Sequence, residues 1–265
     1  MKKLLTILYI LFFALPLYAA DKIKYTDNKD GVYVFEINTK KHGDKIKPVM
    51  TKRVVTPKKL YEDDCYDLVV NGGFFDVKNG KSVSYVIVDG ETISDVNDNV
   101  QLVNSLKKQG RLEKVLSRSE FRVLENNRGK LKFDIAYHNA PIPKSYKIKH
   151  SLQAGPMINP TMDLVNEGFV VKENDVVKSQ SVDILKRRER TAIGLKGKYL
   201  YIVIFTKDHK VDAYEMKEYL TKNLKLKKAM AFDGGLSTAI SYKNLQIGSM
   251  GKHQRCVKSF LVVER

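Results

Sequence analysis

The stretch AMAFDGGLST, residues 229–238, decides how the rest of this 265-residue sequence is interpreted. An apolar run that ends at Phe232 is typical of a buried β-strand, and Asp233 follows it directly, where a chain leaves a sheet. Two glycines then permit a tight turn, and Ser237 and Thr238 add two hydroxyls. The pattern fits two local structures. Either the Asp233 carboxylate is held rigidly at the floor of a pocket, or it caps its own turn.

Three further segments place glycine or polar residues next to predicted strands. They are NGGFFD at 71–76, QAGP at 153–156 and RTAIG at 190–194. The Gly72 and Gly73 amides can face an anion in a tight turn, although a hairpin with aromatic core residues has the same pattern. Arg190 at a strand end suits a phosphate or carboxylate, because its planar fork donates two parallel hydrogen bonds; a solvated surface Arg is the alternative.

Short β-branched or aromatic runs dominate the predicted secondary structure. The predicted strands cover residues 32–37, 66–70, 85–88, 121–124, 131–136, 199–205, 228–232 and 257–263, with a hairpin turn at 126–129. Helices are predicted over 99–108, closed by Gly110, and over 212–224, where Asp212 and Glu215 form a capping box. The pattern predicts an α+β (mixed α/β) fold. We expect a single domain on a large, mostly antiparallel or mixed β-sheet with a few packed helices.

Targeting is predicted from the N-terminus. Residues 1–20 combine a basic start, about a dozen apolar residues and small residues at 19 and 20, which is typical of a secretory signal peptide. A transmembrane anchor is the alternative, but the run is shorter than the roughly 20 residues that span a bilayer. We therefore expect a mature domain, residues 21–265, in the periplasm or outside the cell. In an oxidising compartment Cys65 and Cys256 are either a disulfide or two buried thiols.

The composition restricts the partners. Lys and Arg number 47 against 30 Asp and Glu, a formal net charge of +17 that remains strongly positive without Lys2 and Lys3. The basic residues are scattered and form no recognised nucleic-acid-binding motif, and export argues further against nucleic acid. The charge therefore leaves a phosphorylated small molecule, an anionic envelope polymer or peripheral association with a membrane surface as partners.

The quoted segments, in this order after a signal peptide, resemble the phosphodiester glycosidase domain family, which includes the lysosomal uncovering enzyme. The matching residues are 71–75, 84–90, 153–156, 190–194, 232–235, Ser237 and Thr238. Leu236 departs from the pattern, because members commonly carry a third glycine there, so the loop is expected to be stiffer or its pocket narrower.

The resemblance implies an exported hydrolase that cleaves a sugar-1-phosphodiester, with a phosphorylated saccharide as its partner. Asp233 is then the base or nucleophile at the anomeric carbon, and Arg190 binds the phosphate. The residues expected to bind substrate are Asn71, Gly72, Gly73, Asp76, Gly234, Gly235, Ser237 and Thr238, with Asp76 a candidate second carboxylate. The alternative is a non-catalytic exported polysaccharide-binding or exopolysaccharide-assembly protein with the same pocket. No cofactor is required by the sequence, although a divalent metal such as calcium, held by carboxylate and carbonyl oxygens, is compatible with it.

Overall fold

The computed structural model describes residues 22–28, 30–63, 66–249, 251 and 253–265. The predicted signal peptide and Cys65 lie outside this set, and with Cys65 so does the predicted disulfide. Cys256, the other half of that pair, is exposed. Within the described ranges, no helix has both the length and the apolar character needed to cross a membrane.

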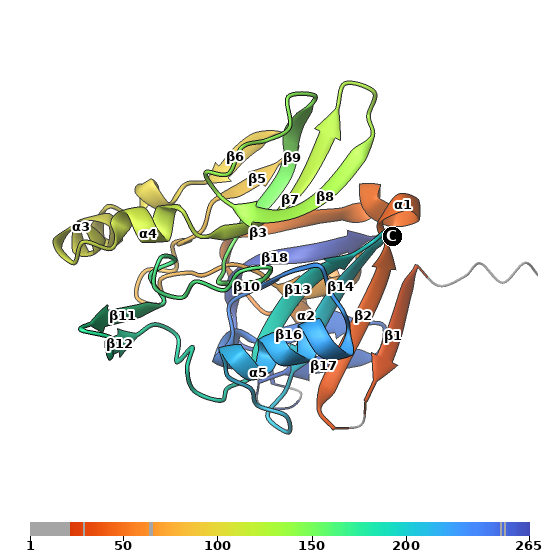
Figure 1. Ribbon diagram of the computed structural model, residues 1–265. Coiled ribbons are helices and arrows are strands. Elements are labelled where there is room, and N and C mark those ends of the chain that lie inside the picture. The colour runs from red at the N-terminus through yellow and green to blue at the C-terminus, as the bar shows by residue number, and fades with distance from the viewer. Residues whose placement is uncertain (1–21, 29, 64–65, 250, 252) are drawn as a thin grey trace, which may run out of the picture.

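Most strands belong to three antiparallel sheets (Figure 1). The six-stranded sheet has the order β1 (Ile23–Asp27), β2 (Val32–Asn38), β14 (Tyr199–Phe205), β13 (Arg190–Lys196), β15 (Lys228–Ala231) and β10 (Met157–Asn159). One five-stranded sheet has the order β17 (Leu245–Gly248), β16 (Ala239–Tyr242), β4 (Tyr66–Asn71), β18 (Val257–Glu264) and β3 (Ile46–Val55). The other has the order β6 (Glu91–Ser94), β5 (Val86–Val88), β9 (Tyr146–Gln153), β7 (Ser119–Asn126) and β8 (Leu131–Tyr137). A separate hairpin pairs β11 (Val170–Glu173) with β12 (Val176–Gln180).

The core explains the nearly continuous apolar sequence of β14. Side chains alternate between the two faces of a strand, so a strand covered on both faces is apolar throughout. Ile202 and Ile204 pack into a cluster that also contains Val70 of β4 and Phe121 of β7, and therefore draws on all three sheets. Tyr201, Val203 and Phe205 belong to a second cluster, on the opposite side of the six-stranded sheet.

Both predicted helices form. The structure has α1 (Thr39–His42), α2 (Pro57–Asp63), α3 (Val100–Lys108), α4 (Leu112–Leu116) and α5 (Ala213–Glu218), which continues as a π-helical turn over 219–223. At α5, Asp212 accepts hydrogen bonds from the Tyr214 and Glu215 amides, and Glu215 accepts one from the Asp212 amide, which confirms the capping box. Met216 and Leu220 bury this segment against the six-stranded sheet. Helices α3 and α4 and the β11–β12 hairpin project on the same side of the molecule (Figure 1).

The predicted α+β class is confirmed, and all eight predicted strands are present. The expectation of one large sheet is corrected: the strands divide among three, as is usual once a twisted sheet would exceed about ten strands. Other strands of the structure were not predicted. Two of them, β3 and β9, mix lysines with apolar residues over their partly exposed halves, which hides the strand pattern.

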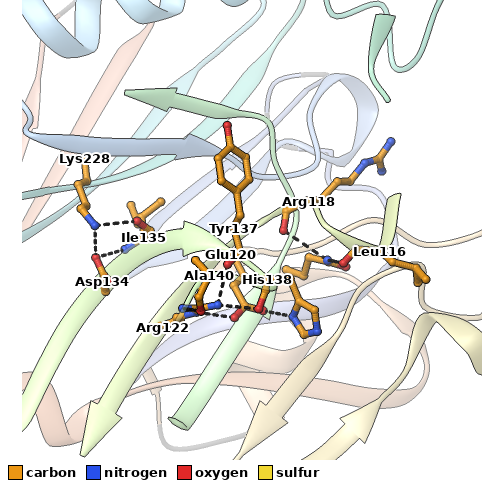
Figure 2. A network of polar contacts seen from close by, with 11 residues as sticks. Leu116, Arg118, Glu120, Arg122, Asp134, Ile135, Tyr137, His138, Ala140 and Lys228 are labelled. Atoms are coloured by element: carbon orange, nitrogen blue, oxygen red, sulfur yellow. Dashed lines mark hydrogen bonds and ion pairs between the residues drawn. The ribbon is translucent and has the colours of Figure 1, made fainter. Parts of the chain in front are cut away.

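A buried polar network holds the chain beside β7 (Figure 2). The Glu120 carboxylate binds Arg122 Nε at 2.6 Å and His138 Nδ1 at 2.7 Å. The terminal nitrogens of Arg122 then donate to three backbone carbonyls, those of Tyr137, His138 and Ala140. The Arg118 side chain points away from this network (Figure 2). Its backbone is nevertheless held, because Gln153 Nε2 of the QAGP segment donates to its carbonyl.

Candidate active site

Asp233 lies just beyond the end of β15, and β4 holds its backbone from both sides. The Asp233 amide donates to the Gly72 carbonyl at 2.9 Å, and Asn71 Nδ2 donates to the Asp233 carbonyl at 2.6 Å. Asn71 Oδ1 accepts from Thr191 Oγ1 at 2.7 Å and from the Ala239 amide at 3.1 Å. The Asn71 side chain is fully buried. It therefore acts as a cross-link that brings the ends of β4, β13 and β16 to Asp233.

The paired glycines of the NGGFF segment allow the backbone to pack closely against neighbouring segments. The Gly72 amide donates to the Ser259 carbonyl at 2.9 Å, and the Gly73 amide donates to Ser259 Oγ at 3.0 Å. A Cβ atom at Gly73 would collide with the Ser84 side chain and with the Gln153 carbonyl. Both amides are thus engaged within the protein. A contact with substrate through them would require these hydrogen bonds to be exchanged.

Asp233 is 9% exposed and lines a cavity of about 630 Å³. Burial raises its pKa from 3.8 to about 6, against the opposing effects of the Ser237 hydroxyl, Arg255, the Gly234 amide and Arg190. Removing an anion from water disfavours its charged form, and the hydrogen bonds and cations offset only part of that cost. A carboxyl that titrates near neutral pH inside a cavity is a common feature of catalytic sites.

The loop after Asp233 is shaped by its glycines. Gly235 has φ +58°, a conformation that favours glycine, and its amide donates to the Glu189 carbonyl at 2.8 Å. A short 3₁₀ turn over Gly235–Ser237 follows and returns Ser237 to the carboxylate. Of the residues predicted from sequence, the cavity is therefore lined by Asp233, Gly234, Gly235 and Ser237.

Arg190 lies behind this wall and is 2% exposed. Its guanidinium donates to four backbone carbonyls, those of Val182, Asp183, Lys186 and Val211. Burial lowers the pKa of Arg190 to about 10, which leaves it charged. The planar fork thus ties the 182–186 segment, part of the cavity wall, to the end of β13. A direct phosphate contact would require some of these carbonyl bonds to be replaced.

Two other predicted residues lie outside the Asp233 cavity. Thr238 is fully buried, and its Oγ1 has no hydrogen-bond partner among the described residues. Asp76 lines an adjoining cavity, where its carboxylate accepts hydrogen bonds from the Lys78 amide and from Asn99 Nδ2. Asp76 is therefore not brought to the Asp233 cavity as a second carboxylate.

Sequence inspection missed the cations that line the cavity. Arg255 lies over the Phe75 ring at 5.5 Å, and Asp233 is the carboxyl whose pKa it lowers. Arg188 pairs with Asp183 at 2.7 Å, and Lys210 pairs with Glu189 at 3.5 Å. Arg255 forms no direct ion pair within the part of the chain that the structure describes. No sequence motif surrounds Arg255. Only the fold, which places it against Phe75, identifies it as a residue of the site.

The residues described hold no group of three or more His, Cys, Asp or Glu placed to bind a metal ion. The cavity instead combines the buried Asp233 carboxyl, the Arg255 guanidinium, the Phe75 ring and two ion pairs, in which Asp183 and the buried Glu189 are already engaged by Arg188 and Lys210. This set can hold an anion beside a carboxylate that reacts at a neighbouring carbon.

Comparisons with known proteins agree with the fold. A family model for phosphodiester glycosidases matches residues 64–264. No curated protein sequence matches the chain. The auto-inhibited catalytic domain of zebrafish N-acetylglucosamine-1-phosphodiester alpha-N-acetylglucosaminidase superposes with a TM-score of 0.63 at 13% identity, covering 92% of this chain and 81% of that one. A hypothetical protein from Synechocystis gives a TM-score of 0.59 at 13% identity, covering 92% and 61%.

Proposed function

This chain belongs to the phosphodiester glycosidase family, and from that membership we propose that it hydrolyses a sugar-1-phosphodiester at Asp233. The observation that carries the assignment is the buried Asp233 carboxyl, with its raised pKa, in a cavity that also presents Arg255. The sugar occupies the space beside Asp233, and the phosphate lies against the Arg255 guanidinium. The products are a free sugar and a phosphomonoester.

The chemistry needs one reactive carboxylate and a cation. The bond between the anomeric carbon and the phosphate oxygen breaks, and its electron pair remains on that oxygen. Water supplies the new hydroxyl, either directly with Asp233 as base or after a glycosyl ester has formed on Asp233. A phosphate is a weakly basic leaving group, so it requires little protonation. Arg255 stabilises the negative charge that grows on it.

Arg190 is proposed as a positioning residue, in place of the direct phosphate contact inferred from sequence. Arg190→Lys keeps the charge but loses most of the four carbonyl bonds. We expect kcat/KM to fall at least about tenfold and Tm to fall by several degrees. Kinetic assays and thermal unfolding of the same preparation check both effects. A tenfold loss at unchanged Tm would instead indicate a direct contact between Arg190 and the phosphate.

The pH dependence follows from the Asp233 pKa of about 6. Because the carboxylate form reacts, kcat/KM should fall about tenfold per pH unit below pH 6 and level off above it. A pH series at constant ionic strength measures this limb. A profile that is flat between pH 5 and pH 7 would contradict the assignment of Asp233 as base or nucleophile.

The decisive experiment for the function is a substrate panel. The purified protein is incubated with sugar-1-phosphodiesters that differ in sugar and aglycone, and released sugar is followed by mass spectrometry, with Asp233→Asn as the matched blank. Release that depends on Asp233 supports the proposal. Saccharide binding without product after long incubation would contradict it and favour the polysaccharide-binding alternative.

We also propose that the protein acts outside the inner membrane, on anionic envelope material. The support is the predicted signal peptide together with the net charge of +17. A C-terminal fusion should be recovered from the periplasmic or extracellular fraction and released from envelopes by salt. Recovery in the cytoplasm would contradict the location.

A further inference from the structure

A second cavity of about 550 Å³ adjoins the Asp233 cavity. Both cavities are lined by Phe74, Phe75, Val77 and Val182, so these residues form a shared boundary. The remaining wall comes from α3, from the chain between α3 and β7, and from Phe169 and Ser181 on either side of the β11–β12 hairpin. Residues of α3 and α4 and at the base of the β11–β12 hairpin, which project together in Figure 1, therefore line this space.

Arg118 lines the second cavity and is only 7% exposed. Its guanidinium carbon lies 4.1 Å from the Phe169 ring centroid and 5.2 Å from that of Phe74. Its Nε donates to the Glu167 carbonyl at 3.0 Å. Among the described residues, nothing accepts a hydrogen bond from its two terminal nitrogens. Burial lowers the pKa of Arg118 to about 10, so it remains a cation in a largely dry setting.

Two carboxylates act electrostatically on Arg118, Glu167 more strongly than Asp233, and Glu167 is already engaged. Glu167 Oε2 accepts from the Ser119 amide and hydroxyl, both at 2.8 Å, and its Oε1 accepts from the Met157 amide at 2.7 Å. Glu167 therefore joins the first residues of β7 and β10, and no ion pair joins it to Arg118 among the described contacts.

Two other cations line the same space. Arg111 Nη2 donates to the Gly168 carbonyl at 2.6 Å and to Ser181 Oγ at 2.8 Å, while its buried Nε has no partner among the described residues. Lys78 is exposed at the rim. The one acidic residue in the described lining is Asp76. The cavity thus presents an excess of positive charge with unused hydrogen-bond donors.

The contrast with the buried structural arginines is informative. Arg122 and Arg190 both use their terminal nitrogens on backbone carbonyls, as expected for arginines that only hold the fold. Among the described residues, Arg118 donates only through Nε to a backbone carbonyl, and the Phe169 and Phe74 rings pack against its guanidinium. A fixed guanidinium with free terminal donors is preorganised to bind an oxyanion through two parallel hydrogen bonds.

We propose that this second cavity binds an anionic group on the aglycone, through Arg118 with support from Arg111 and Lys78. The inference rests on the proposed function, because the sugar and the scissile phosphate then occupy the Asp233 cavity and the aglycone passes the shared boundary. The preferred substrate is therefore a saccharide with a second phosphate or carboxylate beyond the bond that is cleaved. A neutral aglycone would leave the buried Arg118 charge unpaired.

The kinetic test compares aglycones that share one sugar-1-phosphodiester. One aglycone is methyl, one carries a phosphate and one carries a carboxylate. The wild type should show a KM at least tenfold lower for a charged aglycone than for the methyl aglycone. Comparison of the phosphate and carboxylate substrates shows which anion is preferred. In Arg118→Gln the ratio of KM values should approach one, and in the exposed variant Lys78→Gln it should fall about threefold. The matched control Lys107→Gln, on α3 but outside the cavity, should keep the wild-type ratio.

A binding test separates this inference from the proposed function. Isothermal titration with glucose 6-phosphate and glucuronate, against glucose at matched ionic strength, needs no turnover. Anion binding that weakens at least tenfold in Arg118→Gln supports the inference even if no panel substrate is cleaved. Anion binding that is unchanged in folded Arg118→Gln and in Lys78→Gln overturns it, as does a wild-type KM ratio of one.

Discussion

Asp233→Asn should abolish release of sugar from a sugar-1-phosphodiester, lowering kcat by about 10³-fold or more. Asn is nearly isosteric with Asp, so the backbone hydrogen bonds to Gly72 and Asn71 remain. The variant lacks a group that can accept a proton from water or bond to the anomeric carbon. Assays with the best panel substrate measure the loss.

The same substitution makes a prediction about stability. Folding raises the pKa of Asp233 above its ordinary value, so the group stabilises the fold below about pH 4 and loses that contribution as the pH rises through about 6. At pH 7.5 the buried carboxylate costs up to roughly 3 kcal/mol relative to a neutral group. Asp233→Asn should therefore unfold at a Tm equal to or above that of the wild type at pH 7.5, with a smaller advantage at pH 5.

A matched control keeps this result interpretable. Asp44→Asn makes the same change at an exposed site in the 3₁₀ turn Gly43–Lys45, away from the cavity. It should leave both kcat and Tm close to wild type. Retained turnover in Asp233→Asn, or a Tm several degrees below wild type at pH 7.5, would contradict the role assigned to this carboxyl.

Arg255→Gln should lower kcat/KM by about 10²-fold. The proposed phosphate loses the cation that faces it, and removing one such stabilising group typically costs a factor of 10² to 10³. Arg255→Lys should recover part of the activity, because the charge returns without the planar fork that lies over Phe75. Steady-state kinetics on the three proteins measure the series.

The pH profile adds a readout that simple misfolding would not produce. Arg255 lowers the pKa of Asp233, so its removal should move the acid limb of kcat/KM to higher pH than about 6. Tm should change little, because Arg255 forms no direct ion pair within the described structure. The exposed control Arg53→Gln on β3 should match wild type in every respect. An Arg255→Gln enzyme with wild-type kcat/KM would place the phosphate elsewhere.

Sequence patterns identified the strands best where a strand is apolar on both faces. β14 was predicted over the same residues that the structure shows, because clusters on both sides of the six-stranded sheet require apolar side chains. The α5 cap was predicted equally well, since Asp212 and Glu215 interact locally. Strand β3 was missed because its outer half is exposed and carries Lys52 and Arg53, which obscure the alternation.

The candidate site was predictable only in part. Asp233, its glycines and Ser237 are adjacent in sequence, so one motif contained them, and the structure places all of them at the cavity. Arg190 matched the family motif, yet its donors are used on carbonyls of a segment that is brought back by the fold. Arg255 and Arg118 carried no local signal. Each is notable because the described residues leave its terminal guanidinium nitrogens without a hydrogen-bond or ion-pair partner.

The sequence by itself determined the strands that are apolar throughout, the α5 cap and the Asp233 motif, because these depend on residues within one turn or one strand of each other. The tertiary structure decided which polar groups are hydrogen-bonded to other protein atoms and which face a cavity. Protein atoms satisfy Asn71, Gly72, Gly73 and Arg190, whereas no described residue accepts a hydrogen bond from the terminal nitrogens of Arg118. Hydrogen-bond satisfaction depends on residues far apart in the chain, so no local pattern could have shown it.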